Sequence, residues 1–256
     1  MKLFDTHAHV YDKAFDNDRE SMLEDVFKQV GTLVCPSEDV ASSRLASALS
    51  QKYPRIYAAV GIHPQETAKA VPEDLEILRQ MVKENPKIVA IGEIGLDYYY
   101  LNSPKDIQKD WFGRQIELAG ELDLPIIIHD RDAHGDTVSI LKEHADKKLR
   151  GILHCYSGSY ETAETLIQMG FYISFAGPVV FPKSTALKEV ARRLPLSKML
   201  VETDSPYLTP PPFRGRRNDP SKVFYVAQEI ARLKEIPLET VIETTEQNAK
   251  DIYRIS

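Results

Sequence analysis

The sequence predicts an α/β fold, a TIM (β/α)₈ barrel formed by a single domain, from three observations. Short apolar runs rich in β-branched residues recur eight times along the 256 residues. Stretches with apolar residues near helical spacing lie between these runs. Alternating strands and helices imply parallel strands joined by right-handed crossovers. Eight such units in a chain of this length favour the closed barrel over the alternative, an open doubly wound sheet.

The strands are predicted from these apolar runs. In chain order they are Leu3–Ala8, Gly31–Cys35, Ile56–Ile62, Ile88–Ile94, Pro125–His129, Gly151–Cys155, Phe171–Ala176 and Met199–Glu202. Predicted helical stretches include Arg19–Val30, Asp74–Glu84, Ile107–Glu121 and Tyr160–Met169. Pro72 stands where a helix would begin, whereas Asn85-Pro86 and Gly170 stand where helices would end. Two longer segments interrupt the alternation, 178–183 and the proline-rich 205–220, and long loops in compact domains are often functional.

The composition indicates a cytoplasmic enzyme. The formal net charge of −6 argues against a surface coated with basic residues, although bound cations would reverse the local sign at acidic sites. Cys35 and Cys155 are too few for a disulfide framework, which favours a reducing compartment. No apolar run reaches the length of a transmembrane helix, and the N-terminus leaves no room for a signal peptide. We therefore expect no membrane partner.

His7 and His9 are the first candidate metal ligands. They lie two residues apart at the end of the first predicted strand, so their side chains point the same way. Two convergent neutral imidazoles suit a divalent transition metal. A lone His-x-His pattern is weak evidence, because such pairs also occur by chance. Matching residues at other strand ends decide the matter.

Four other predicted strands end in a histidine or a carboxylate. These residues are Glu93, His129, His154 and Asp204. The carboxyl ends of barrel strands converge on one face, where burying such groups together without a cation would be costly. Six ligands exceed what one tetrahedral ion needs, and a carboxylate can bridge two ions about 3.5–4 Å apart. The set predicts two divalent ions; Mg²⁺ is the expected metal, with Mn²⁺ and Zn²⁺ left open.

Five motifs and the His129 segment resemble the TatD family of metal-dependent deoxyribonucleases. The motifs are Asp-Thr-His-Ala-His (5–9), Gly-Ile-His-Pro (61–64), Gly-Glu-Ile-Gly-Leu-Asp-Tyr (92–98), His-Cys-Tyr-Ser-Gly (154–158) and Glu-Thr-Asp-Ser-Pro-Tyr-Leu (202–208). The resemblance runs almost end to end and includes Arg-Gly-Arg-Arg-Asn-Asp-Pro (214–220). The wider amidohydrolase superfamily shares the His-x-His pattern but often bridges its metals with a carboxylated lysine on the fourth strand. Glu93 stands at that position here.

The resemblance implies a role for each ligand. It implies a TIM barrel that hydrolyses DNA phosphodiester bonds, typically as a 3′→5′ exonuclease acting on single strands. One ion would be held by His7, His9, Glu93 and Asp204, and the other by Glu93, His129 and His154. An activated water would be the nucleophile, with Asp204 as the candidate general base. Glu202, on the same strand face as Asp204, would support the ligands from behind.

Further residues are predicted to contact the substrate, which we expect to be single-stranded DNA bound by a monomer. In the family resemblance, His63 faces the scissile phosphate. Arg131 and Arg214 could bind phosphate oxygens, the latter from the proline-rich loop with its neighbours at 216 and 217. The tyrosines at 98–100 could stack on a base, although consecutive residues cannot all face the site.

Two alternatives stay open at this point. The same ligand set would serve a D-aminoacyl-tRNA deacylase or another hydrolase of the amidohydrolase type, since fold and ligands do not select the bond that is cleaved. The chain could also be a non-catalytic binding module, but its complete ligand set argues against a decayed site.

Overall fold

The computed structural model describes residues 2–147 and 149–255, and its central feature is one parallel sheet of eight strands ordered β1 to β8. The strands are β1 (Leu3–Asp5), β2 (Val30–Cys35), β3 (Ile56–Val60), β4 (Ile88–Asp97), β5 (Ile126–Arg131), β6 (Gly151–Leu153), β7 (Tyr172–Phe175) and β8 (Met199–Val201). Each strand pairs in parallel with the next along the chain. The predicted TIM barrel is confirmed.

Contacts between the first and last strands bring the two edges of the sheet together. The amide of Thr6 donates to the carbonyl of Val201 at 3.2 Å, and Ala8 forms a parallel bridge with Ser205. All eight predicted strands are present, with shifted ends. β1 is shorter than predicted because the chain leaves the ladder after Asp5, and β4 is longer because its pairing with β5 continues to Asp97 and Arg131.

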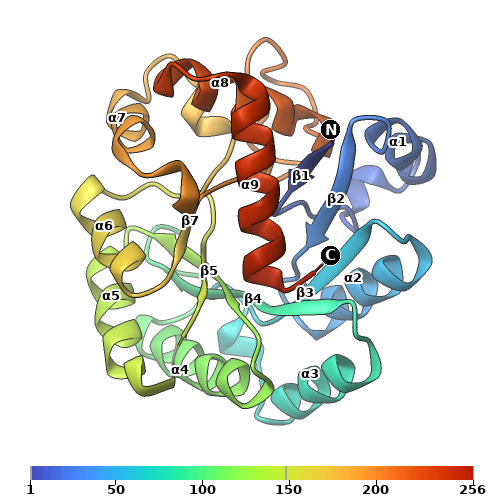
Figure 1. Ribbon diagram of the computed structural model, residues 1–256. Helices are drawn as coiled ribbons and strands as arrows, with labels where there is room; N and C mark the ends of the chain where they lie inside the picture. The colour runs from blue at the N-terminus through green and yellow to red at the C-terminus, as the bar shows by residue number, and fades with distance from the viewer. Residues whose placement is uncertain (1, 148, 256) are drawn as a thin grey trace.

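Helices cover the outside of the barrel (Figure 1). They are α1 (Arg19–Val26), α2 (Val40–Lys52), α3 (Glu73–Glu84), α4 (Lys105–Leu122), α5 (His134–Glu143), α6 (Tyr160–Gln168), α7 (Thr185–Arg193), α8 (Val223–Lys234) and α9 (Leu238–Tyr253). Local chemistry explains where some of them begin: the Asp39 carboxylate accepts from the Ser42 amide at 2.7 Å, completing a capping box before α2. The two long segments stay mostly irregular, apart from the short 3₁₀ helices Gly177–Val180 and Pro220–Lys222.

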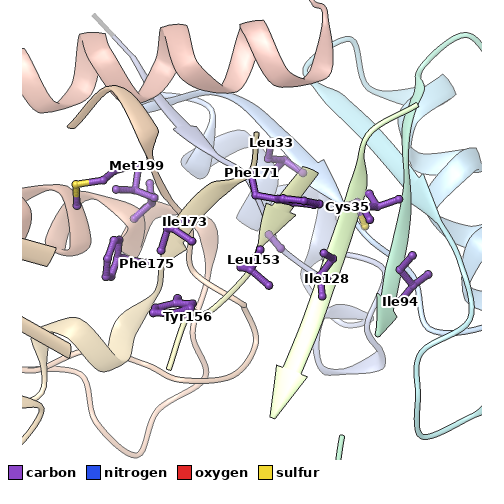
Figure 2. Close-up of a cluster of buried hydrophobic side chains, with 14 of the residues drawn as sticks. Leu33, Cys35, Ile94, Ile128, Leu153, Tyr156, Phe171, Ile173, Phe175 and Met199 are labelled. Atoms are coloured by element: carbon purple, nitrogen blue, oxygen red, sulfur yellow. The ribbon is translucent and has the colours of Figure 1, made fainter. Parts of the chain in front are cut away.

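The core has two layers. The outer layer lies between the strands and the helices, and Figure 2 shows part of it, including Leu33, Ile128 and Phe175. The inner layer fills the barrel with residues of the opposite strand face, such as Phe4, Ile127 and Leu200. Because successive side chains of a strand alternate between its faces, each strand contributes to both layers.

The last helix closes one end of the barrel. α9 lies across the barrel in Figure 1, and Ala249, Ile252 and Tyr253 near its end belong to the same buried cluster as the inner strand residues. The Tyr253 hydroxyl donates to the Thr6 carbonyl at 3.1 Å. With this end filled by apolar side chains, polar side chains can gather only toward the opposite end, where the strands have their carboxyl termini.

Among the described residues, no helix combines the length and apolar character needed to cross a lipid bilayer.

Candidate metal centre

The strand pleat directs the predicted ligands into the barrel. Ile127 and Ile152 belong to the inner layer; His129 lies two residues further along β5, and His154 lies directly after the end of β6. On β8 the same alternation runs from Leu200. Glu202 follows Leu200 by two residues, just past the end of β8, whereas Asp204 lies further on with a left-handed backbone and is placed by its contacts with His7 and His9. The structure brings all six predicted ligands together at the carboxyl ends of the strands.

Glu93 lies at the middle of this cluster, and its two oxygens face different pairs of histidines. Its Oε2 is 3.2 Å from His7 Nε2 and 3.6 Å from His9 Nε2. Its Oε1 is 2.8 Å from His129 Nδ1 and 2.7 Å from His154 Nε2. One buried carboxylate therefore lies between two sets of nitrogen ligands, the arrangement that a bridging carboxylate requires.

Asp204 completes the first set. Its Oδ1 lies 3.6 Å from His7 Nε2 and 3.4 Å from His9 Nε2. Among the described residues, its other oxygen, Oδ2, has no hydrogen-bond or ion-pair partner, and the side chain is 13% exposed. The backbone of Asp204 is left-handed (φ 55°) and its amide donates to the His7 carbonyl at 2.9 Å, which fixes the side chain at the mouth of the barrel.

Three of the histidines are held from outside so that the other ring nitrogen faces the cluster. His154 Nδ1 lies 3.3 Å from Glu202, His129 Nε2 lies 3.2 Å from Asp97, and His9 Nδ1 lies 3.3 Å from the Tyr11 hydroxyl. An imidazole that donates its outer N–H to such a partner presents an unprotonated nitrogen inward, as metal-binding histidines do.

The ring nitrogens that face the cluster lie close to one another. Their distances show whether the residues fit a bound cation. His7 Nε2 is 3.1 Å from His9 Nε2, and His129 Nδ1 is 3.2 Å from His154 Nε2. Two inward lone pairs at that distance repel each other unless a proton or a cation lies between them. The donor set therefore fits divalent cations, and the described residues form three groups of potential ligands: His7, His9, Asp204; His7, His154, Glu202; and His63, Glu93, His129.

The charges of the cluster shift the pKa values of its members. Burial alone would raise the pKa of Glu93, but the surrounding histidines hold it well below the usual range. Burial lowers the pKa of His7 and so favours the neutral form of this imidazole. Burial also disfavours charge on His9, yet the hydrogen bond to Asp204 and the charge of Glu93 outweigh it and raise the pKa of His9 to about 9. The carboxylates thus attract positive charge strongly, whether protons or cations.

Asp97 is a candidate site residue that the sequence did not lead us to predict. It is fully buried at the end of β4, and its Oδ2 contacts His129 and accepts from the Gln65 side chain at 2.8 Å. Burial alone would raise the pKa of Asp97, but the hydrogen bonds from His129 and from the Tyr100 backbone lower it. Its position four residues after Glu93 is the signal that could have identified it, because both residues belong to β4 and Asp97 is the last residue of that strand.

Asp5 joins the first strand to the end of the last, and Glu202 joins the end of β8 to the end of β6. Asp5 accepts from the amide of Thr203 at 3.0 Å, from its hydroxyl at 2.6 Å and from the His7 amide at 3.2 Å. Glu202 accepts from the Cys155 amide at 2.7 Å as well as contacting His154. The supporting role of Glu202 stays a prediction.

Glycines on either side of Glu93 let β4 approach β5 closely. A Cβ added at Gly92 would lie 2.6 Å from Ile127 Cβ. A Cβ added at Gly95, where φ is +131°, would lie 2.1 Å from the carbonyl oxygen of His129. Side chains at these positions would push apart the two strands that carry Glu93 and His129.

Replacing Gly95 with Ala is therefore expected to destabilise the protein by about 2 kcal/mol or more, because it combines a strained backbone with a steric clash. The matched control is Gly135→Ala in α5, where an added Cβ meets nothing within 4 Å and φ is ordinary. That change should be neutral or stabilising by up to about 1 kcal/mol. Urea unfolding of both variants measures the difference, and equal stabilities would contradict the close approach.

Two of the residues predicted to contact the substrate, His63 and Arg131, lie at different places relative to the ligands. His63 is buried among the ligands, with Nε2 3.5 Å from Glu93 Oε1 and its ring against that of His129 at 4.4 Å. Arg131 lies at the end of β5 with its guanidinium over the rings of Tyr99 and Tyr100. These positions leave the phosphate-binding roles of His63 and Arg131 as predictions.

The proline-rich loop carries the remaining candidate, Arg214, which is exposed and lies 4.1 Å from the centre of the Phe181 ring. The neighbouring Arg217 is paired with Asp18 at 2.6 Å, so the predicted basic cluster is partly neutralised. Phosphate binding by Arg214 stays a prediction.

Comparison with known proteins gives consistent results. The sequence model of the family described as "TatD related DNase" matches residues 4–254. A Bacillus subtilis protein named "Uncharacterized metal-dependent hydrolase YabD" is 46% identical over 99% of this chain and 100% of its own length. An Escherichia fergusonii protein named "3'-5' ssDNA/RNA exonuclease TatD" is 30% identical over 99% of this chain and 100% of its own length. The crystal structure of YJJV, a TatD homologue from Escherichia coli K12, superposes with a TM-score of 0.94 at 30% identity, covering 99% of this chain and 98% of that one.

Proposed function

The chain belongs to the family of TatD-related DNases and is a metal-dependent hydrolase, and we propose that its substrate is single-stranded nucleic acid, cleaved at phosphodiester bonds from the 3′ end. One observation carries the proposal: the two oxygens of Glu93 face separate pairs of histidine nitrogens. Paired divalent ions bridged by a carboxylate are suited to phosphoryl transfer, because they stabilise both the attacking and the leaving oxygen.

In this proposal six residues hold two divalent ions, with Mg²⁺ the expected metal. His7, His9 and Asp204 would hold one, His129 and His154 would hold the other, and Glu93 would be a ligand to both. When bound, the pair would polarise a phosphoryl oxygen and lower the pKa of a water molecule.

The chain's own residues then position the reaction. Asp204 keeps a carboxylate at the mouth: burial opposes its charge, but His9, His7 and His154 lower its pKa. Its unengaged Oδ2 can accept the proton of the attacking water, which makes Asp204 the proposed general base. His63, beside Glu93 at 3.5 Å, is placed to donate a hydrogen bond to a phosphate oxygen entering between the ligands. Glu202 and Asp97 hold His154 and His129 in the orientation that this geometry needs.

The phosphate preference is supported by cationic side chains around the mouth and by the relative named as an exonuclease of single-stranded DNA and RNA. Arg131 and Arg214 stand on loops or strand ends of this face. Because fold and ligands alone do not select the bond, the substrate has to be tested directly.

The test compares two substrates under one set of metals. A single-stranded DNA or RNA oligonucleotide labelled at its 5′ end is incubated with the protein and Mg²⁺ or Mn²⁺, beside a D-aminoacyl-tRNA. We expect products that shorten one nucleotide at a time from the 3′ end and no release of amino acid. Two results would rule out the proposed nuclease activity: release of amino acid with no shortening of the oligonucleotide, or no shortening of the oligonucleotide with any divalent metal.

A further inference from the structure

We propose that Tyr99, Tyr100 and Arg131 form a nucleotide-binding corner beside the metal centre, with a substrate base stacked on the tyrosines and its phosphate bound by the arginine. The inference rests on the proposed function and names the part of the substrate that this face recognises. Tyr99, Tyr100 and Arg131 together are called the tyrosine corner.

Asp97 connects the tyrosine corner to the metal centre. Its Oδ1 accepts from the amides of Tyr99 and Tyr100, each at 2.9 Å, while its Oδ2 lies 3.2 Å from His129 Nε2. The same buried carboxylate thus fixes the turn that carries the tyrosines and the ring of a proposed metal ligand. A group bound on the tyrosines is held at a defined position relative to that ligand.

The side chains of Tyr99 and Tyr100 are exposed, although aromatic side chains of this size are usually at least partly buried. Tyr99 is 58% and Tyr100 54% exposed, and their rings meet edge to face at 4.9 Å and 86°. Tyr98, in contrast, is engaged: its hydroxyl donates to Asp136 at 2.6 Å and Lys105 lies over its ring at 4.0 Å. Of the three consecutive tyrosines, Tyr98 packs against its neighbours and the next two are more than half exposed to solvent.

Arg131 supplies a cation at this corner. Its guanidinium lies 4.2 Å from the centre of the Tyr99 ring and 5.0 Å from that of Tyr100. Within residues 2–147 and 149–255, the guanidinium makes no hydrogen bond and no ion pair, unlike that of Arg217, which Asp18 binds. A guanidinium lying over an aromatic ring keeps its N–H edge available, and that edge matches the oxygens of a phosphate.

Together these features match one nucleotide of a single strand. Open aromatic faces stack on any base, and a free guanidinium nearby binds the adjoining phosphate, which is how single-stranded nucleic acid is bound without sequence preference. A base in a duplex would be covered by its neighbours and could not reach the rings. The tyrosine corner therefore selects unpaired nucleotides next to the metal centre.

The test measures binding separately from cleavage. Fluorescence anisotropy follows a labelled hexanucleotide with phosphorothioate linkages, in Mg²⁺, binding to the wild type and to the double variant Tyr99→Ala with Tyr100→Ala. We expect the dissociation constant to rise about 10- to 100-fold in the double variant. The double variant Tyr99→Phe with Tyr100→Phe, which keeps the aromatic faces, should stay within about twofold of the wild type. Leu45→Ala, at an apolar side chain of α2 that is 53% exposed, is the control and should change nothing.

A second set of oligonucleotides identifies the stacked base. A single abasic residue is moved through the six positions, and at one position the wild type should lose affinity by a factor similar to that of the alanine variant. The affinity of the alanine variant should not change when the abasic residue is at that position, because removing the tyrosine rings and removing the base abolish the same contact. Thermal unfolding confirms that each variant is folded, as expected for exposed positions.

The outcomes separate this inference from the proposed function. Unchanged affinity in the folded alanine variant, or equal sensitivity to the abasic residue in both proteins, would overturn the tyrosine corner while leaving nuclease activity intact. Tyrosine-dependent binding together with no cleavage of ordinary oligonucleotides would overturn the nuclease function and support the corner. A wild type that binds no oligonucleotide would overturn both.

Discussion

Replacing Glu93 with Gln is expected to lower kcat/KM by at least about a thousand-fold and to reduce the bound metal. The amide is nearly isosteric but turns one of the two oxygens into an N–H₂ group, which donates hydrogen bonds and does not bind a cation. Since the two oxygens face different histidine pairs, one pair loses its carboxylate ligand. Lewis-acid catalysis contributes several kcal/mol, and each 1.36 kcal/mol corresponds to about tenfold in rate.

The matched control for this variant is Glu84→Gln at the exposed end of α3, which removes the same charge far from the cluster. Its activity and metal content should equal those of the wild type. Elemental analysis of the purified proteins gives the metal content, and steady-state kinetics gives the rate. A Glu93→Gln protein with full activity would place the reaction elsewhere on the molecule.

Replacing Asp204 with Asn is expected to lower kcat about 10²- to 10⁴-fold with little change in KM, because an amide oxygen cannot take the proton of the attacking water. Asn tolerates the left-handed backbone of this position (φ 55°), so the change tests the carboxylate rather than the fold. The measurement is the pair kcat and KM on one oligonucleotide, with the metal content determined beside it.

Asp132→Asn is the control for the general base. Asp132 is exposed just beyond β5 and also has a left-handed backbone (φ 56°), so the same substitution is made at a matched conformation away from the ligands. It should leave kcat unchanged. An Asp204→Asn protein with wild-type kcat would remove Asp204 from the proposed proton transfer, while a normal kcat with a raised KM would assign it to substrate binding instead.

The fold could be predicted because strands buried on both faces are apolar along their whole length. That signal fails at the strand ends that matter for function. β4 and β5 continue to Asp97 and Arg131, whose backbones are partners in the parallel sheet at the mouth of the barrel. Charged residues lack the apolar pattern by which a buried strand is predicted. At β1 the chain instead departs after Asp5, because the following residues bond to β8 and its loop. Both differences lie at the functional face.

The ligand set could be predicted because each member stands at the end of an apolar run and the barrel brings those ends together. The contacts between the ligands and their neighbours could not be predicted. Sequence spacing does not show that His63 lies 3.5 Å from Glu93, or that Asp97 contacts His129, since the curvature of the sheet sets these distances. The exposure of Tyr99 and Tyr100 likewise depends on the turn that Asp97 holds, not on the run of tyrosines.

The central claim is that Glu93 lies between two metal ions, and anomalous diffraction from a crystal soaked in Mn²⁺ tests it most directly. We predict two peaks about 3.5–4 Å apart. One lies beside His7, His9 and Asp204, the other beside His129 and His154, and the Glu93 carboxylate stands between them. A single peak, or two peaks on the same side of that carboxylate, would contradict the account.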